Sequence, residues 1–230
     1  TVSTKKRSKN ISLTATGKND MPAAIARGKF ITLEGPEGAG KTTQIEHLQT
    51  FLESMGHETV VTREPGGTRF ANRLREVLLD PDLRSVCPDA ETLLMFAGRA
   101  DNLARVIIPA LDAGKWVLCD RFTDATFAYQ GGGRGVDINR IASLETWVQG
   151  NLLPDLVLIF DLPVSRGLDR ARKRGAPDRF EREPTEFFER VRTTYLHRAS
   201  SNSNRYVVLD ASQPRDVVTS LAIDAIARKL

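Results

Sequence analysis

The sequence predicts a three-layer α/β fold, in which helices cover both faces of a central five-stranded parallel sheet. Two observations support this prediction. Short apolar runs rich in β-branched residues alternate with helix-like segments along the chain, and a parallel sheet with crossover helices is the simplest fold for such alternation. Several of these runs also end in a polar residue, as at Asp120, Asp161 and Asp210, and the ends of the strands are where α/β sheets bind ligands.

The expected strands share short apolar sequences, and they cover residues 29–34, 59–62, 116–119, 156–160 and 206–210. The expected helices show apolar residues at helical spacing, and they cover residues 41–55, 68 to about 79, 88–113, 138–149, 164–174, 184–200 and 214–230. We expect residues 88–113 to form one helix despite Pro109, and residues 131–135, which are mostly glycine, to be irregular.

A chain of 230 residues is long enough for one well-cored α/β domain, which we expect over residues 29–230. The net charge of +4 resides in the first twenty residues, so the remainder is formally neutral. A neutral body argues against a broad nucleic-acid-binding face. Residues 1–28 are rich in Ser, Thr, Lys and Asn, and we expect a disordered basic tail. This tail is either an extension without a role or a tether to an anionic surface.

No apolar stretch is long enough to span a membrane. Cys87 and Cys119 are the only cysteines, and neither belongs to a CxxC pair. A disulfide framework and a zinc site are therefore not indicated, and a reducing, cytoplasmic location is expected.

Residues 35–42 fit the pattern G-x-x-x-x-G-K-[ST] between a predicted strand and a predicted helix. In such a phosphate-binding loop, backbone N–H groups and the helix N-terminus surround a polyphosphate. Lys41 would reach the β- and γ-phosphates, and the Thr42 hydroxyl would bind Mg²⁺. The predicted ATP-binding residues are those of the loop and its first helical turn, namely Gly35, Pro36, Glu37, Gly38, Ala39, Gly40, Lys41, Thr42 and Thr43.

Arginines are unusually regular in the predicted helix at 164–174. Arg166, Arg170 and Arg174 recur every four residues, which stacks like charges on one face unless an anion offsets them. Arg179 and Arg182 follow in a loop. This pattern fits an arginine-rich lid at about 170–183 that closes over a nucleotide, although a solvated helix face would explain it as well. The chain has no N-K-x-D sequence, which weakens a GTPase interpretation.

From about residue 28 to the C-terminus, the chain resembles the bacterial thymidylate kinases. The resemblance rests on the phosphate loop, on T-R-E-P-G-G-T at 62–68, D-R-F at 120–122, A-Y-Q-G-G-G-R-G at 128–135 and P-D at 154–155. It implies a P-loop kinase fold and a Mg²⁺-dependent transfer of a phosphoryl group from ATP to dTMP, giving dTDP for dTTP synthesis, in an enzyme that is usually a homodimer.

The resemblance also assigns roles to individual residues. It implies that Arg63 and Arg121 bind the phosphate of dTMP, that Glu37 meets the sugar 3′-OH, and that Tyr129 lies against the deoxyribose. Thr126, Gln130 and Arg99 would contact the acceptor near its base. Asp120 would organise Mg²⁺ through water, together with Thr42. Lys41, Asp120, Arg121, Arg170 and Arg174 form the implied catalytic set, with Arg179 also at ATP.

Two assignments remain open at this stage. The family places an aromatic residue four positions before Arg99 to stack on thymine, but here Met95 holds that position and Phe96 follows it. Either side chain could stack on the base, or both could belong to the core. The sequence also leaves open which of Arg170, Arg174 and Arg179 reaches the transferred phosphoryl group.

Two other functions remain as alternatives to a dTMP kinase. One is a kinase for another nucleoside monophosphate. The other, from a different class, is a non-catalytic ATP-dependent switch or regulator. This second alternative includes a regulator that binds nucleic acid, but the neutral body of the chain counts against it. We expect contact with neither nucleic acid nor a membrane.

Overall fold

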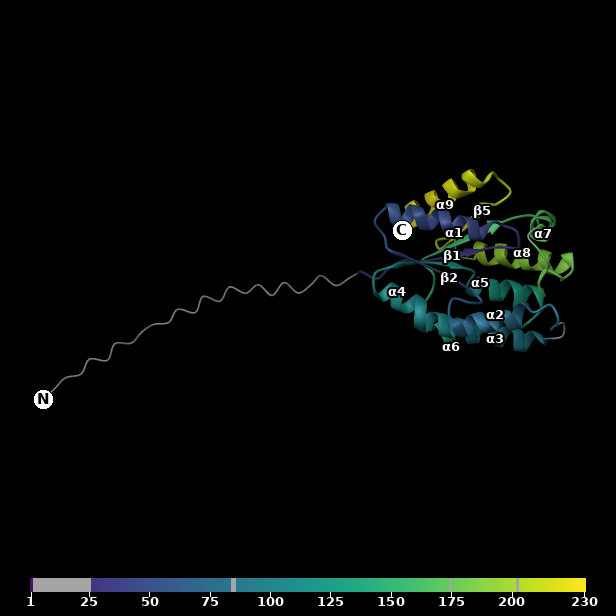
Figure 1. Ribbon diagram of the computed structural model, residues 1–230, viewed down its shortest axis with the longest axis horizontal. Coiled ribbons are helices and arrows are strands. Elements are labelled where there is room, and N and C mark those ends of the chain that lie inside the picture. Colours follow the sequence, from purple (N-terminus) through teal and green to yellow (C-terminus); the bar gives the residue numbers. More distant parts are fainter. Residues whose placement is uncertain (2–25, 84–85, 174, 202) are drawn as a thin grey trace.

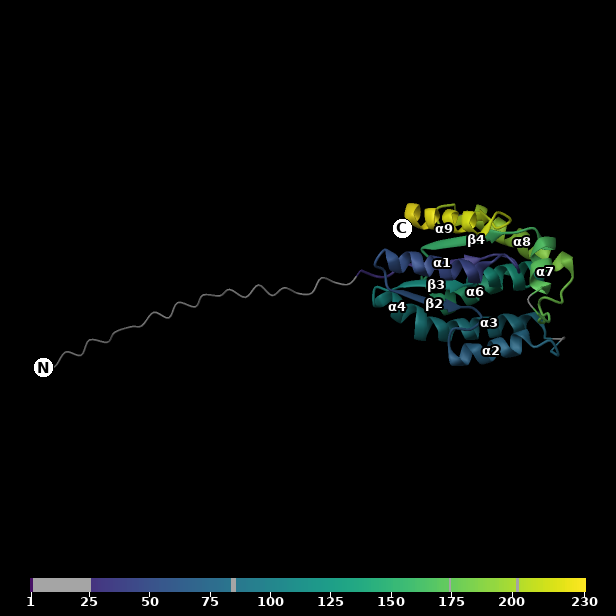
Figure 2. The same ribbon diagram turned by 45° about the horizontal axis from the view of Figure 1, so that its top comes forward.

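The computed structural model describes residues 1, 26–83, 86–173, 175–201 and 203–230. In this part of the chain, five strands form one parallel sheet in the order β2-β3-β1-β4-β5. Helices lie above and below this sheet in both ribbon views (Figures 1 and 2). The predicted α/β fold is therefore confirmed. The expectation of a disordered tail concerns residues that lie, for the most part, outside the described ranges.

The strands are β1 (Phe30–Glu34), β2 (Thr59–Arg63), β3 (Trp116–Asp120), β4 (Leu156–Asp161) and β5 (Tyr206–Asp210). The sheet core is fully buried because apolar side chains point to both faces, as in Leu156-Val157-Leu158-Ile159 of β4. In the register of the sheet, Asp120 at the end of β3 lies opposite Arg63 of β2 on one side and opposite Leu33 of β1 on the other. The register therefore gathers their polar ends at one edge.

One face of the sheet is covered by α1 (Lys41–Ser54) and α9 (Arg215–Lys229). Their apolar side chains, such as Leu48 and Leu52 of α1 and Ala222 of α9, pack on Leu33 and neighbouring strand residues. Burial of this kind contributes roughly 25 cal/mol per Å² of apolar surface, which makes it the main stabilising term for the layer.

The opposite face is covered by a longer series of helices. They are α2 (Arg69–Leu79), α3 (Pro88–Asn102), η1 (Leu103–Ile107), α4 (Ile108–Asp112), α5 (Thr123–Thr126), η2 (Phe127–Gly133), α6 (Ile138–Gln149), α7 (Val164–Arg172) and α8 (Thr185–Ser200). Leu103 and Ile107 pack on Phe30 and Val117, while Phe187 and Val191 of α8 pack near Val157. Figure 2 shows α2 and α3 furthest from the sheet, with α6 beside α3.

The helix expected at 88–113 is continuous in direction but is not α-helical throughout. A π-helical turn, η1, separates α3 from α4 just before Pro109. Proline has no N–H to donate and its ring clashes with the carbonyl of the preceding turn, and a wider π turn relieves both problems.

The expectation of an irregular segment at 131–135 was wrong for its first three residues, which belong to the π-helix η2. A Cβ atom at Gly132 would lie 2.1 Å from Thr194 Oγ1, and one at Gly133 would lie 2.4 Å from the ring of Phe187. The glycines are therefore required because η2 packs against α8 at very short range. This packing fixes the residues of η2 that precede them, including Tyr129 and Gln130.

After β1 and β3, which are neighbours in the sheet, the chain continues on opposite faces of the sheet. The loop after β1 leads to α1 on one face, while β3 leads to α5 and η2 on the other. A crevice forms outside the sheet wherever adjacent strands diverge in this way, and such crevices are the usual ligand sites of α/β proteins. Among the described residues, no helix has the length and apolar character needed to cross a membrane.

Candidate active site

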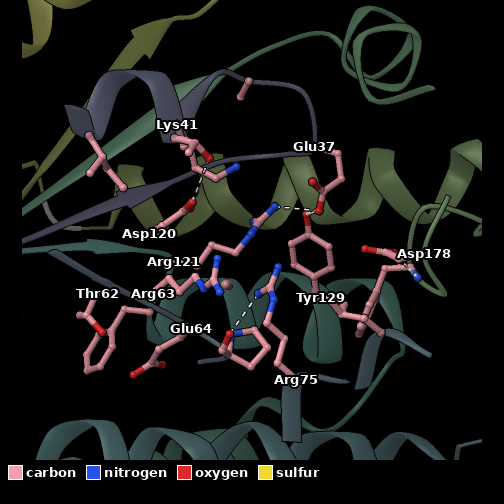
Figure 3. Close-up of a pocket in the computed structure, with 18 of the residues that line it drawn as sticks. Glu37, Lys41, Thr62, Arg63, Glu64, Arg75, Asp120, Arg121, Tyr129 and Asp178 are labelled. Atoms are coloured by element: carbon pink, nitrogen blue, oxygen red, sulfur yellow. Dashed lines mark hydrogen bonds and ion pairs between the residues drawn. The ribbon is translucent and has the colours of Figure 1, made fainter. Parts of the chain in front are cut away.

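A cleft of about 980 Å³ opens at this edge of the sheet. It is lined by the phosphate loop, by residues at the ends of β2 and β3, by α3 and η2, and by the segment after α7. Figure 3 shows Lys41 and Asp120 at its upper side, Arg63, Arg75 and Arg121 in its middle, and Tyr129 and Asp178 on the far wall. A volume of about 980 Å³ lies at the upper end of the range for small-molecule and cofactor sites.

The shape of the phosphate loop depends on a backbone contact with α7. A Cβ atom at Gly38, whose φ is 69°, would lie 2.2 Å from the Gly167 carbonyl oxygen, and one at Gly167 would lie 2.4 Å from the carbonyl oxygen of Glu37. Both positions therefore need glycine. The contact also brings Arg170, one turn further along α7, to the loop, where its Nη1 lies 3.4 Å from the Gly38 carbonyl oxygen.

Lys41 lies inside the loop at the first position of α1 and is 7% exposed. Its Nζ donates to the carbonyl oxygens of Gly35 at 3.1 Å and Pro36 at 3.0 Å. The pKa of Lys41 is lowered to about 8, first by burial and then by the charge of Arg121, while the carboxylates of Asp120, Glu37 and Glu34 act against this shift. A polyphosphate held in the loop would favour the charged lysine for the same electrostatic reason.

Thr42 and Asp120 face each other across the crevice. Thr42 Oγ1 lies 3.4 Å from Asp120 Oδ2, and Asp120 Oδ1 is a buried acceptor without a hydrogen-bond partner among the described residues. Among the described residues, no cluster of three or more His, Cys, Asp or Glu side chains could hold a metal ion. An alcohol and a carboxylate are hard oxygen donors of the kind that Mg²⁺ uses alongside water and phosphate oxygens.

Arg121 connects the phosphate loop to the opposite wall of the cleft. Its Nη2 donates to Glu37 Oε1 at 2.8 Å, its Nη1 donates to the Gly35 carbonyl oxygen at 2.8 Å, and its guanidinium lies 4.8 Å from the centre of the Tyr129 ring. The hydroxyl of Tyr129 donates to the same Glu37 oxygen at 3.0 Å. The structure thus brings together Glu37, Arg121 and Tyr129 as the resemblance implied.

Tyr195, which the sequence did not indicate as a site residue, forms a hydrogen bond with Arg121. The Tyr195 hydroxyl accepts from Arg121 Nη1 at 3.1 Å and donates to Glu34 Oε2 at 3.0 Å. Arg121 has a φ of 67°, a left-handed conformation that is unfavourable for a side-chain-bearing residue and is found mainly where surrounding contacts impose it. Tyr195 lies far along the chain on α8 in no recognisable motif, so only the folded structure could reveal it.

Three arginines point into the centre of the cleft, one more than expected. Arg63 and Arg121 are joined by Arg75 of α2, whose Nη1 donates to the Pro65 carbonyl oxygen at 3.0 Å (Figure 3). Burial lowers the pKa of Arg75, and the nearby charges of Arg63 and Arg121 lower it further. Such a concentration of positive charge favours a dianion. The sequence offered no signal that distinguishes Arg75 from Arg73, which forms an exposed ion pair with Glu76 on the same helix.

The far end of the cleft is built around Arg99. This residue is 2% exposed, its Nε donates to Glu64 Oε2 at 2.7 Å, and its Nη2 donates to Thr126 Oγ1 at 2.9 Å. Its Nη1 is buried without a hydrogen-bond partner among the described residues. Gln130 also lines the cleft and donates from Nε2 to Glu91 Oε1 at 2.8 Å.

Met95 and Phe96 have different environments. Met95 is half-buried and lines the cleft beside Arg99 and Thr126. Phe96 is 2% exposed and packs in a core cluster with Phe127, Val136 and Ile141, with the Arg99 guanidinium 4.7 Å from its ring centre. Phe96 therefore does not lie where a ligand in the cleft could stack on it.

The three arginines predicted near ATP also differ in position. Arg170 lies at the phosphate loop, whereas Arg174 lies outside the described residues. Arg179 is 6% exposed and forms an ion pair with Glu91, with Arg179 Nη2 2.6 Å from Glu91 Oε2. The cleft lining includes its neighbours Asp178 and Phe180 but not Arg179 itself. The structure thus places Arg179 in a buried ion pair, away from the phosphate loop.

Comparison with known proteins places this site in one family. The family model described as thymidylate kinase matches residues 33–221. The thymidylate kinase of Pseudomonas entomophila (strain L48) is 59% identical over 199 residues, which are 86% of this chain and 94% of that protein. The thymidylate kinase of Pseudomonas fluorescens (strain Pf0-1) is 62% identical over 187 residues, which are 81% of this chain and 89% of the relative.

A solved structure agrees with these relatives. The crystal structure of thymidylate kinase from Ehrlichia chaffeensis has a TM-score of 0.71 and is 32% identical, and the match covers 87% of this chain and 99% of that one. Since the family model spans well over half of the chain and close relatives share most of their length with it, the chain belongs to the thymidylate kinase family and is a nucleoside-monophosphate kinase.

Proposed function

We propose that the protein transfers the γ-phosphoryl group of ATP to dTMP, giving dTDP for dTTP synthesis. The observation that supports this most directly is the contact between Glu37 and Arg121, because it joins the phosphate-binding loop to the wall that carries Arg63, Arg75 and Tyr129. A donor polyphosphate in the loop and an acceptor phosphate at the arginines would therefore meet in the same cleft.

The ATP side of the reaction is assigned to the loop and to α7. The backbone of residues 35–40 and the N-terminus of α1 surround the phosphates, Lys41 neutralises the β- and γ-phosphates, and Thr43 extends the first helical turn. Arg170 approaches the same loop from α7 and supplies positive charge to the transferred group. Arg174 is assigned the same role on the basis of its place in the sequence.

The residues around Thr42 and Asp120 fit a Mg²⁺ ion. The buried, unpartnered Asp120 Oδ1 would accept from a metal-bound water, and Thr42 Oγ1 lies on the ATP side. When bound there, Mg²⁺ would offset the negative charge of the ATP phosphates. The described part of the chain offers these two oxygen donors, as is usual for Mg²⁺ bound chiefly through substrate phosphates and water.

The acceptor is assigned to the remainder of the cleft. Its phosphate is placed at Arg63, Arg75 and Arg121, its 3′-OH at Glu37, and its deoxyribose on Tyr129. A phosphate monoester has a second pKa near 6, so it is mostly dianionic at pH 7 and needs no general base. The main barrier is repulsion between two anions, at roughly 4 kcal/mol per unit-charge pair about 4 Å apart for an effective dielectric near 20. The arginines reduce that repulsion.

The base is placed between Met95 and Arg99, with Thr126 and Gln130 beside it. The buried, unpartnered Arg99 Nη1 is a donor suited to a pyrimidine carbonyl oxygen. Glu64 and Thr126 fix the rest of the guanidinium, so its orientation is set before the nucleotide binds, and little ordering entropy remains to be lost on binding.

An acceptor panel tests this assignment. With ATP and Mg²⁺, we expect dTMP to be preferred over AMP, because Arg99 and Met95 shape a pyrimidine site, and over CMP, because Tyr129 is placed against a deoxyribose. We expect dUMP, which lacks only the methyl group of thymine, to be the nearest competitor. Lys41→Ala should reduce dTDP formation by at least about 100-fold with an unchanged circular dichroism spectrum, whereas Lys115→Ala should be neutral because Lys115 forms an exposed ion pair with Glu58. Preference for another monophosphate, or an active Lys41 variant, would refute the assignment.

We also propose that the enzyme acts as a homodimer through α2, α3 and α6. Exposed apolar side chains gather on these adjoining helices, namely Phe70, Val77, Leu93, Ile138 and Trp147, and Trp147 is 81% exposed. Grouped exposed apolar residues of this kind mark an interface. Leu93→Glu should give a monomer in sedimentation analysis, while Met55→Glu at the end of α1 should not, and a dimeric Leu93→Glu protein would contradict the proposal.

The reaction is placed in the cytoplasm. Cys87 and Cys119, both within the described residues, are free thiols, as expected in a reducing compartment.

A further inference from the structure

Residues 178–183 are attached to the body of the protein by Arg179. Its Nε donates to the Leu78 carbonyl oxygen at 2.9 Å and its backbone N–H donates to the Leu79 carbonyl oxygen at 3.3 Å. Leu78 and Leu79 are the last residues of α2. The final carbonyl groups of a helix have no partner within the helix and carry partial negative charge, so an arginine is well suited to bind them.

The other end of the Arg179 side chain reaches a buried carboxylate that several elements share. Glu91 of α3 is fully buried, and its Oε2 lies 2.6 Å from Arg179 Nη2. Its Oε1 accepts from Gln130 at 2.8 Å and from Arg134 Nε at 3.3 Å. Arg134 in turn donates to Glu183 at 2.5 Å. The segment 178–183 is thus fastened near both of its ends by ion pairs that involve α3 and the chain after η2.

The two residues beside Arg179 line the cleft. Asp178 and Phe180 both contribute to its wall, and Asp178 is visible there in Figure 3. The Phe180 ring meets the edge of the Tyr129 ring at a centroid distance of 6.0 Å and an angle of 82°. This is a favourable aromatic geometry. The position of Tyr129, against which the deoxyribose is placed, therefore depends on where Arg179 holds Phe180.

We propose that Arg179 is a positioning residue of the acceptor site, which fixes residues 178–183 as a permanent wall that supports Tyr129. This inference rests on the placement of dTMP beside Tyr129 in the proposed function. A swinging lid that included these residues would have to separate Arg179 from Glu91. Glu91, which also accepts from Gln130 and Arg134, would then lack its closest partner in a buried site. Residues 178–183 therefore stay in place when ATP binds.

The proposal predicts that substitution of Arg179 weakens the binding of dTMP but not the binding of ATP. Arg179→Lys keeps the positive charge but lacks the planar fork that reaches Leu78 and Glu91 together. We expect it to raise KM for dTMP by about tenfold and to leave KM for ATP within about twofold of the wild type. Isothermal titration with dTMP alone should show a similar loss of affinity, because a permanent wall is in place before ATP binds.

A second variant gives the same test without breaking a buried ion pair. Phe180→Leu leaves Arg179 and Glu91 intact but removes the ring that supports Tyr129. It should raise KM for dTMP and reduce the preference for dTMP over its 2′-hydroxy counterpart, 5-methyluridine 5′-monophosphate. Arg182→Gln is the matched control, since Arg182 is exposed in the same segment and contacts only the Pro81 carbonyl oxygen among the described residues, and it should behave as the wild type.

The outcomes distinguish this inference from the proposed function. If the wild-type enzyme does not phosphorylate dTMP, the proposed function itself fails. If the wild type does so, but Arg179→Lys lowers kcat or raises KM for ATP with dTMP binding unchanged, Arg179 is an ATP ligand and the inference is overturned. It is also overturned if Phe180→Leu changes neither the affinity for dTMP nor the preference for the deoxyribose.

Discussion

Glu37 and Arg121 form an ion pair across the crevice between β1 and β3, with Arg121 Nη2 2.8 Å from Glu37 Oε1. A carboxylate inside a phosphate-binding loop is electrostatically unfavourable unless a cation offsets it. Here the cation is Arg121, which directly follows β3 and lies on the side of the cleft where the acceptor is proposed to bind. In the proposed function, the loop is therefore a shared element with one side for ATP and the other for the acceptor.

Glu37→Gln tests what this carboxylate does. We expect kcat/KM for dTMP to fall by at least about tenfold, which corresponds to about 1.4 kcal/mol, because the amide is a weaker partner for both Arg121 and the 3′-OH. The assay should be repeated with 3′-deoxythymidine 5′-monophosphate. A smaller loss with this analogue is expected from a direct contact with the 3′-OH. Equal losses with both acceptors would instead mean that Glu37 acts only by holding Arg121.

Arg170→Ala should lower kcat for dTDP formation while changing KM for dTMP little. Arg170 approaches the phosphate loop at Gly38, and an arginine at the transferred phosphoryl group is typically worth about 10³ to 10⁵ in rate. Arg172→Ala is the matched control, because Arg172 lies on the same helix and its ion pair among the described residues, with Asp169 at 3.7 Å, is exposed. Equal kcat values for the two variants would remove Arg170 from the catalytic set.

Met95→Ala and Phe96→Ala should have separate effects. Met95 lines the cleft, so its truncation should raise KM for dTMP with little change in stability. Phe96 is buried among Phe127, Val136 and Ile141, and its truncation should cost about 3 to 5 kcal/mol of the free energy of unfolding. Urea unfolding and steady-state kinetics measure the two quantities. An altered KM for the Phe96 variant at unaltered stability would reverse the assignment.

The parts of the site that could be predicted from sequence are those that follow directly from a strand or a short motif. The phosphate loop, Arg63, Asp120 and Arg121 are of this kind, because each is adjacent to a strand end and parallel strands bring their ends together. Their place in the sequence, next to the end of a strand, is therefore enough to predict that they lie together at this edge of the sheet.

The parts that could not be predicted depend on helix rotation and on long-range packing. Arg75 and Arg73 are two residues apart on α2, yet only Arg75 faces the cleft, and the sequence does not fix that rotation. Arg179 follows a run of arginines that suggests a lid, but its partner Glu91 is 88 positions away and the ion pair becomes evident only after folding. The π-helical turns before Pro109 and at Gly131–133 likewise respond to tertiary contacts.

The pH dependence of stability should reveal Glu34, which lies buried between Tyr195 and the backbone N–H of Phe122. Its pKa is raised from 4.5 to about 8, first by burial and then by the charge of Asp124, while Arg121 acts in the opposite direction. Between pH 4.5 and 8 the folded protein then retains a proton that the unfolded chain has released. Stability from this group is therefore complete below pH 4.5 and is lost as the pH rises toward 8, with a slope of up to about 1.4 kcal/mol per pH unit.

Glu34→Gln has no such proton to lose, so urea unfolding between pH 5 and 8 should show the variant gaining stability relative to the wild type as pH rises. Exposed Glu46→Gln should run parallel to the wild type, and a constant difference between wild type and Glu34→Gln across this range would show that Glu34 is ionised in the folded protein.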